Sequence, residues 1–370
     1  MSVPRIRVDG FNKNFEKKIF GEIVRSVSTR MYIKSVVSDL GKYEVIQQGD
    51  RPILGYSDDQ PFEKYKSVIL FGDHTLSLYL PKAPFLLATD GIKILQSTIL
   101  KRDYLYYLTQ NYIPKSQGYK RHFSVLKQVI VNYSQDYSEQ SVIGSLFRTL
   151  DDLLTSYKDN LTNYQSLKAT MLSKMFPKAG QTVPEIRLDG FEDGWEEKEF
   201  SKFVKRVTQN SDSNSLPKVE FEDIISGQGR LNKDISNKFD NRKGIHFKPG
   251  YTLYGKLRPY LNNWLLPKFE GVALGDFWVF DPNGNDSNFI YYLVQSNRYQ
   301  KVANDTSGTK MPRSDWKSVS STTFAIPQTV AEQQAIGLYF SNIDKLIAAH
   351  QEKISQLETL KKKLLQDMFI

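Results

Sequence analysis

The strongest constraint on the fold of this chain is that its sequence begins twice. The segment VPRIRVDGFNKNFEKKIF starts at Val3 and the segment VPEIRLDGFEDGWEEKEF starts at Val183, and ten of their eighteen positions are identical without a gap. Internal similarity of this kind predicts two copies of one architecture. A solenoid needs several stacked units, so two copies are expected to form a pair instead.

The similarity continues to the end of each copy. Several residues of the first copy return 193 positions later: Glu139-Gln140, Ile143-Gly144, Phe147 and Met175-Phe176 match Glu332-Gln333, Ile336-Gly337, Phe340 and Met368-Phe369. Between these ends, YYL at 106–108 matches YYL at 291–293, and GYKRHFSVLKQV at 118–129 resembles GTKMPRSDWKSV at 308–319. The offset grows from 180 to 193, which indicates insertions in surface loops of the second copy. The sequence therefore predicts a tandem duplication.

Each copy is expected to end in a long helix. Neither glycine nor proline occurs in 145–176 or 338–370, and apolar residues repeat there every seven positions, as in a coiled-coil seam. The residues expected to pack are Ile143, Leu150, Leu153, Leu154, Tyr157, Ile336, Ile343, Leu346, Ile347 and Leu357. Because the chain supplies one equivalent helix for the other, intramolecular antiparallel pairing is the most economical hypothesis. Parallel pairing, or pairing with the helix of another subunit, stays open.

The longer first part of each copy is expected to be a mixed α/β globular domain. Short apolar runs such as SVILF at 67–71 and DFWVF at 276–280, bounded by Gly, Pro and Asp, are typical of strands. The predicted class is α+β, with globular domains at 1–137 and 178–329. Helical spacers are predicted at 138–177 and 330–370.

Composition narrows the chemistry. The chain has a net charge of +9 and no cysteine, and its four histidines are scattered, so disulfides and thiolate metal sites are excluded and a zinc site is not expected. Neither a signal peptide nor an apolar run long enough to span a membrane is visible, so the expected location is the cytoplasm. The basic balance points toward a polyanionic partner, although many basic proteins bind none.

The most informative stretch is NRKGIHFKPGYTLYGKLRPYLNNWLLPK at 241–268, where cations and aromatic residues alternate without an acidic residue. Such interleaving is typical of nucleic-acid binding. The loops SQGYKRH at 116–122 and SGTKMPR at 307–313 occupy matching places in the two copies. The candidate DNA-binding residues are Lys115, Lys120, Arg121, His122, Lys243, His246, Lys256, Arg258, Ser307, Thr309, Lys310 and Arg313. The competing interpretation makes the aromatic residues core and the cations a solvated face, with Arg258 bracing its domain.

Catalytic motifs are missing. The phosphate loop GxxxxGK[ST], the metalloprotease motif HExxH and the nucleophile motif GxSxG do not occur. Acidic pairs such as Asp58-Asp59 and Glu222-Asp223 exist, but one sequence cannot show whether carboxylates converge on a metal. No catalytic residue or metal ligand is therefore assigned, and a stand-alone nuclease remains an alternative.

Taken in order, the motifs resemble the specificity (S) subunit of type I restriction–modification enzymes. The resemblance is carried by PEIRLDGFEDGWEEKEF, GYTLYGKLRPYLNNW, SGTKMPRSDWKSV, IPQTVAEQQAIGLYFSNIDKLI and LETLKKKLLQDMFI. It extends over essentially the whole chain and is weakest in the interior of the first domain, about 29–97.

The resemblance implies two target recognition domains, each reading one half of a split, asymmetric DNA sequence. It further implies that two modification (methyltransferase) subunits dock on the helices and that restriction subunits join the complex. The chain itself would bind no cofactor, because S-adenosylmethionine, ATP and magnesium would be bound by those partners. The rival hypothesis from the residues is a coiled-coil scaffold or adaptor that binds no DNA.

Overall fold

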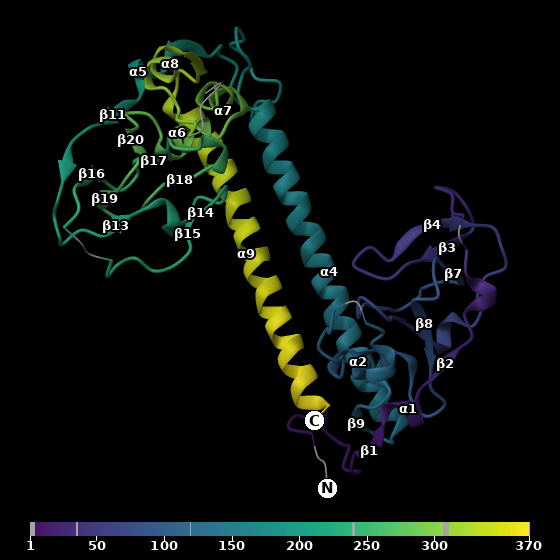
Figure 1. Cartoon of the computed structure of the whole chain (residues 1–370). Helices are drawn as coiled ribbons and strands as arrows, with labels where there is room; N and C mark the ends of the chain where they lie inside the picture. The colour runs from purple at the N-terminus through teal and green to yellow at the C-terminus, as the bar shows by residue number, and fades with distance from the viewer. Residues whose placement is uncertain (1–3, 35, 119, 239–240, 306–310, 370) are drawn as a thin grey trace. The chain divides into compact units, whose positions relative to one another are not determined.

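The computed structural model describes residues 4–34, 36–118, 120–238, 241–305 and 311–369. Its contacts divide the chain into two compact units, coloured by residue number in Figure 1. The first unit comprises Met1–Asp159 and Glu352–Ile370, and the second comprises Asn160–Gln351. Each unit therefore contains one globular domain and a stretch of both long helices.

The two long helices are α4 (Tyr137–Lys174) and α9 (Val330–Met368). Asp136 caps α4, because its carboxylate accepts hydrogen bonds from the backbone N–H groups of Ser138 and Glu139, and these bonds lower the pKa of Asp136. At α9 the Thr329 hydroxyl accepts from the backbone N–H of Glu332. The helices therefore begin at side-chain caps, and α4 ends shortly before Pro177.

Within each unit the segments of α4 and α9 run antiparallel. In the first unit Phe147 stacks on Phe369, and Lys158 pairs with Glu358 at 2.7 Å. In the second unit Phe176 stacks on Phe340, and Tyr164 meets the ring of His350. Because the residue number on one helix falls as that on its partner rises, the expected intramolecular antiparallel pairing is confirmed.

The globular domain of the first unit is built from short strands and helices. Its elements are β1 (Glu16–Ile19), α1 (Phe20–Ile23), β2 (Arg25–Val27), η1 (Arg30–Tyr32), β3 (Tyr43–Ile46), β4 (Ile53–Ser57), η2 (Tyr65–Ser67), β5 (Ile69–Gly72), β6 (Leu78–Tyr79), β7 (Phe85–Leu87), β8 (Ile92–Gln96), α2 (Arg102–Asn111), α3 (Phe123–Leu126) and β9 (Ile130–Tyr133). They form a four-stranded sheet β2-β8-β5-β6, a three-stranded sheet β4-β3-β7 and a β1-β9 pair.

The globular domain of the second unit repeats this plan with additions. Its elements are β10 (Glu196–Glu199), α5 (Phe200–Phe203), β11 (Lys205–Val207), β12 (Asn210–Ser211), β13 (Lys218–Val219), η3 (Phe221–Asp223), β14 (Ile224–Ile225), β15 (Arg230–Leu231), β16 (Gly244–Phe247), β17 (Thr252–Gly255), η4 (Pro259–Leu261), β18 (Trp264–Leu265), β19 (Gly271–Ala273), β20 (Phe277–Asp281), α6 (Ser287–Leu293), α7 (Asn297–Ala303), α8 (Trp316–Ser321) and β21 (Thr323–Ile326). The sheet β11-β20-β17-β18 has the strand order of β2-β8-β5-β6, and β10-β21 corresponds to β1-β9. The third sheet, β12-β16-β19-β13, differs.

These sheets confirm the α+β class and show where the two copies diverge. In the first domain the third sheet lies within residues 43–87, inside the interval where the sequence resemblance is weakest. The shared sheets form a common frame. The third sheet gives each domain its own surface.

The repeated opening segment has a structural role. Arg7 pairs with Glu139 and Arg187 pairs with Glu332, each with Nε and Oε1 2.7 Å apart. In both pairs the arginine also donates to a nearby backbone carbonyl, and the glutamate stands in the first turn of a long helix. The hydrogen bonds to these glutamates raise the pKa of both arginines. In each copy the opening segment therefore binds the long helix of the same copy through an ion pair.

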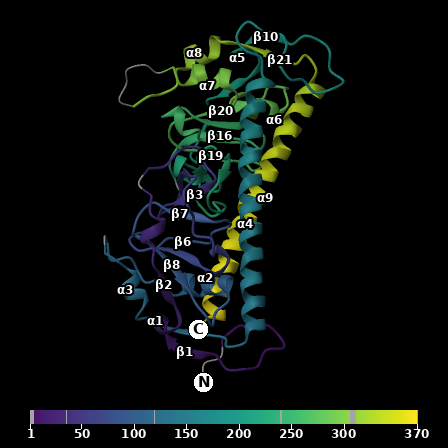
Figure 2. The ribbon, with the colours of Figure 1, turned by 90° about the vertical axis from the view of Figure 1, so that its right-hand side faces the viewer.

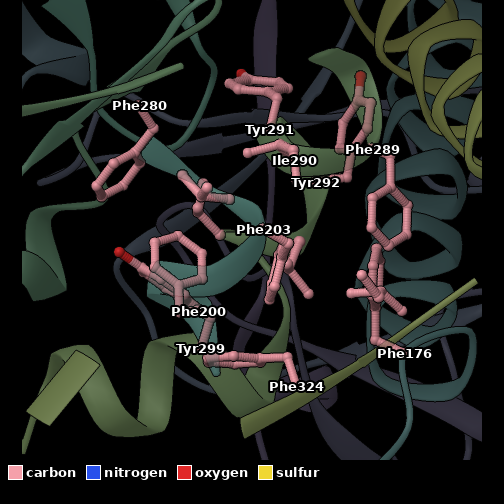
Figure 3. Close-up of a cluster of buried hydrophobic side chains, with 14 of the residues drawn as sticks. Phe176, Phe200, Phe203, Phe280, Phe289, Ile290, Tyr291, Tyr292, Tyr299 and Phe324 are labelled. Atoms are coloured by element: carbon pink, nitrogen blue, oxygen red, sulfur yellow. The ribbon is translucent and has the colours of Figure 1, made fainter. Parts of the chain in front are cut away.

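Aromatic residues fill the cores, and the long helices take part in them. In the second unit the Phe200 ring lies 5.2–5.7 Å from the rings of Phe280, Tyr299 and Phe324. Figure 3 shows Phe176, beyond the end of α4, in the same cluster. In the first unit helix α2, labelled in Figure 2, contacts α4 through Tyr107 and Phe147, and contacts α9 through the Lys361 side chain, which lies over the Tyr107 ring. There Tyr107 meets Phe147 at 5.0 Å and Tyr104 meets Phe369 at 5.2 Å.

Candidate nucleic-acid interface and helical surface

Two basic segments far apart in sequence meet in the second domain. The backbone N–H of Arg258 donates to the carbonyl of Pro312 at 2.7 Å, and that of Ser314 donates to the carbonyl of Lys256 at 2.9 Å. Leu257 and Arg313 form an antiparallel bridge between these bonds. The fold thus joins the KLRPYL segment to the end of the SGTKMPR loop in one surface element.

One carboxylate organises the charge of this element. Asp276 accepts from Arg313 at 2.9 Å and lies 3.7 Å from Lys256. The side chains of Arg313 and Asp276 remain 56% and 26% exposed, so the pair faces solvent. We name Lys256, Arg258 and Arg313 the basic cluster; together with Asp276 it carries a net positive charge. Asp276 was not singled out by the sequence, and only the pairing of the two loops reveals its role.

The turn that follows Lys256 is conformationally unusual. Arg258 and Asn262 both have left-handed backbone conformations, with φ of 49° and 55°, which is uncommon for residues other than glycine. Two backbone hydrogen bonds close the turn, from Leu261 to Arg258 and from Asn262 to Pro259. Among the described residues the Arg258 guanidinium has no hydrogen-bond or ion-pair partner. The described contacts therefore hold Arg258 through its backbone, and show no bracing by its side chain.

Other cations of the basic stretch are already paired or lie elsewhere. Arg242 pairs with Glu220 at 2.6 Å, and hydrogen bonds from Arg242 and Lys238 lower the pKa of Glu220. His246, on strand β16, has its Nε2 2.7 Å from Glu270. Lys243 is exposed beside the same strand. In the described part of the chain no hydrogen bond or ion pair joins Lys243 or His246 to the basic cluster. Ser307, Thr309 and Lys310 lie outside the described residues.

The first domain has a related but differently charged arrangement. Lys115, Lys120 and Arg121 are exposed, and Arg121 lies 3.4 Å from Asp90. The residue after β5 is Asp73, whereas the residue after the corresponding β17 is Lys256. Asp73 accepts hydrogen bonds from the loop before α3, as the Lys256 carbonyl does from the loop before α8.

His122 corrects the sequence prediction. Its side chain is fully buried, its Nε2 accepts from the backbone N–H of Gln117 at 3.0 Å, and its Nδ1 lies 3.1 Å from the carbonyl oxygen of Asp73. With one ring nitrogen accepting, the other carries the proton and donates to that carbonyl. His122 therefore shapes the loop from inside and has no exposed atom for a base contact.

The helix residues predicted to pack divide into two groups. Ile143, Leu150, Leu154, Ile336, Ile343 and Leu357 are buried, and Tyr157 and Ile347 are partly buried. Leu153 and Leu346, by contrast, are 42% and 41% exposed, because they lie off the seam on the outer face of their helices. Leu167 and Leu360 are similarly exposed. Within each of these two pairs the residues stand 193 positions apart, so the repeat duplicates an outer apolar surface, which we name the outer leucine stripe.

Sequence reasoning missed a triad that the repeat also duplicates. Tyr107 donates to Asp151 at 2.8 Å, and Asp151 also binds Lys361. In the second unit Tyr292 donates to Asp344 at 2.9 Å, and Asp344 binds Lys168. Burial, aided by the neighbouring carboxylates, raises the pKa of both tyrosines, which keeps the phenols protonated donors. The constant offset of 193 between the two aspartates, and between the two lysines, was the available signal.

Each unit has a cavity beside its triad. The volumes are about 830 Å³ in the first unit and about 520 Å³ in the second. Equivalent positions line both: Tyr106, Tyr107, Arg148, Asp151, Asp152 and Thr155 correspond to Tyr291, Tyr292, Ser341, Asp344, Lys345 and Ala348. In the second cavity two buried lining groups, the Trp264 Nε1 donor and the Gln295 Oε1 acceptor, lack hydrogen-bond partners. The cavities are therefore a property of the repeat.

Within the described residues, no group of three or more His, Cys, Asp or Glu side chains is arranged to hold a metal ion. Across the same residues, no helix combines the length and apolar character needed to cross a membrane.

Comparison with known proteins matches these features to one family. Residues 195–359 match the model of the type I restriction modification DNA specificity domain. The S subunit of a type I restriction–modification system from M. genitalium is 15% identical, with a TM-score of 0.66 over 100% of this chain and 99% of that one. A chain from a study of assembly and conformational transition in the type I R-M system is 12% identical, with a TM-score of 0.50 over 96% and 97%.

No curated protein matches the sequence. The domain model covers most of the second domain and most of α9, and the structural likeness extends the shared fold to the whole chain. In this family the specificity subunit is non-catalytic, and catalysis belongs to the partner modification and restriction subunits. Residues 195–359 therefore match the DNA specificity domain of type I restriction–modification systems, and the whole chain shares the fold of the S subunits of such systems.

Proposed function

We propose that this chain binds DNA as the specificity subunit of a type I restriction–modification complex, with one recognition domain for each half of a split, asymmetric target. The basic cluster carries the proposal. Lys256, Arg258 and Arg313 are brought together from two loops that backbone hydrogen bonds hold in fixed register. Such cations contact phosphates and fix the protein on the duplex, while other side chains read base edges.

The difference between the two domains supports an asymmetric target. The shared sheets have the same strand order, but the third sheet differs between the domains. The position after the equivalent strands β5 and β17 is a buried aspartate in one domain and a partly exposed lysine in the other. Two half-sites bound by domains whose third sheets differ should have different sequences.

Two modification subunits would dock on the helices. The outer leucine stripe and the paired cavities support this, because each occurs once per repeat and so fits a partner present in two copies. Exposed apolar surface repeated along helices is typical of protein interfaces. S-adenosylmethionine, ATP and magnesium would be bound by the partner subunits, and the complex would work in the cytoplasm, where its DNA lies.

Sequencing methylated adenines in genomic DNA, with and without this chain, tests the proposal. The expected result is one split motif whose methylation disappears when the chain is deleted and returns when it is restored. Retention of the purified chain on random duplex across a salt series is the companion measurement, and a steep ionic dependence is expected. An adaptor would show little ionic slope, and a nuclease would cleave the duplex in magnesium; either result would refute the proposal.

A further inference from the structure

The turn in the basic cluster exposes two large apolar side chains at its tip. Tyr260 is 57% exposed and Leu261 is 38% exposed, on the connection between β17 and β18. A single exposed apolar residue is ordinary on a protein surface. Two adjacent exposed apolar residues on a short turn that also carries basic residues need a further explanation.

This turn is held rigidly from several sides. Left-handed Arg258 and Asn262 flank it, and such conformations persist only where the surroundings enforce them. On one side Arg258 bonds to Pro312; on the other, the Gly227 N–H donates to the Asn262 carbonyl and the Ser226 hydroxyl to the Leu261 carbonyl. Because the backbone is already fixed, binding through the tip would cost little conformational entropy.

The first domain lacks this tip. Its corresponding connection, between β5 and β6, covers only residues 73–77, whereas the connection in the second domain covers 256–263. Leu76 in the first domain is also left-handed, with φ of 60°, but it is partly buried and packs on the core of its own unit. The frame alone therefore does not require an exposed tyrosine and leucine here. They are an addition specific to the second domain.

The charge around the tip selects the partner. Lys256 and Arg258 precede the tip on the same segment, and the backbone bridge between Leu257 and Arg313 adds a third cation. Because this cluster stays net positive beside Asp276, the partner is polyanionic, and a polyanion with flat apolar faces is a nucleic acid. Aromatic side chains stack on bases, and apolar side chains inserted between base steps unstack and kink a duplex. We propose that Tyr260 and Leu261 form a wedge that contacts base faces and unstacks one step in the half-site bound by the second domain only. This inference rests on the DNA binding proposed above.

The test uses the full chain and a duplex that it selects from a random pool, with 2-aminopurine placed at successive positions. For the wild type, fluorescence should rise at one step of one half-site and remain low in the other half. Tyr260→Ala should abolish this rise and weaken binding by about 5- to 100-fold, the range of base–aromatic stacking. Tyr260→Phe should retain most of both effects because it keeps the ring.

Tyr137→Ala is the matched control, since Tyr137 is 50% exposed on α4, outside the recognition loops. It should leave affinity and fluorescence unchanged, and melting curves should show all three variants equally folded. If the wild type selects a duplex but Tyr260→Ala binds and unstacks it equally well, the wedge is wrong and the DNA-binding function stands. Weakened assembly with modification subunits at unchanged DNA affinity would also overturn the wedge, by making the tip a protein contact. If no duplex is selected at all, the proposed function itself fails.

Discussion

At the scale of single residues, Asp276 controls how much positive charge the candidate interface presents. It binds Arg313 and approaches Lys256, so it holds two cations in place while cancelling one charge. A carboxylate in this position lowers attraction to any phosphate backbone and keeps the cationic side chains ordered. The two effects can be separated by substitution.

Asp276→Asn should strengthen retention on random duplex at low salt, because the basic cluster gains one net charge. Arg313→Ala should weaken it and reduce the slope of log affinity against log salt by about 1. Each shift should be about fivefold, the factor for about 1 kcal/mol between charges in water. Elution from immobilised duplex measures both, with Glu197→Gln on strand β10 as the control for loss of a carboxylate. Shifts of the same sign for both variants would contradict this account.

Residues such as these mark the limit of sequence reasoning. Composition and spacing were sufficient to select Lys256, Arg258 and Arg313 as candidates, because a basic run without acidic residues can be recognised directly in the sequence. Their junction and the role of Asp276 depend on backbone pairing between loops more than fifty residues apart, which no local pattern encodes. His122 was misassigned for the same reason, since its burial follows from how the loop folds over Asp73.

At the scale of elements, the long helices were the most predictable part. A seven-residue apolar period reports directly which face of a helix is buried, and the seam residues are buried or partly buried as that period indicates. The period does not say what covers apolar residues off the seam. Leu153 and Leu346 belong to the outer leucine stripe, so their partner is expected outside this chain.

The combined change Leu153→Lys and Leu346→Lys should leave the melting temperature unchanged and weaken assembly with modification subunits. The matched seam change Ile343→Ala should instead destabilise the chain by about 2–5 kcal/mol, as expected for a buried aliphatic residue. Thermal melts and size-exclusion chromatography of the mixed subunits measure the two effects. Loss of stability in the lysine variant would place these leucines in the internal packing after all.

At the scale of the whole molecule, each unit is completed by the other repeat. Phe369, from the end of the second copy, packs on Tyr104 and Phe147 in the first unit. Phe176, from the end of the first copy, packs on Phe289 and Phe340 in the second. The triads follow the same exchange, since Lys361 binds Asp151 and Lys168 binds Asp344.

Phe369→Ala should therefore destabilise the first unit, far away in sequence, by about 3–5 kcal/mol, the usual cost of removing a buried phenylalanine. Hydrogen exchange should show lost protection in 102–111 and little change in 287–293. Phe176→Ala should produce the reverse pattern. If either substitution lowered protection equally in both segments, this account of one phenylalanine completing one unit would be wrong.

The exchanged helix ends also have a historical consequence. An ancestor with a single repeat would have carried both the phenylalanine at its end and the aromatic core on which such a phenylalanine packs. Two identical molecules could therefore have completed each other's cores around a twofold axis. Fusing two such genes would then have kept both cores closed while leaving the two halves free to diverge in sequence.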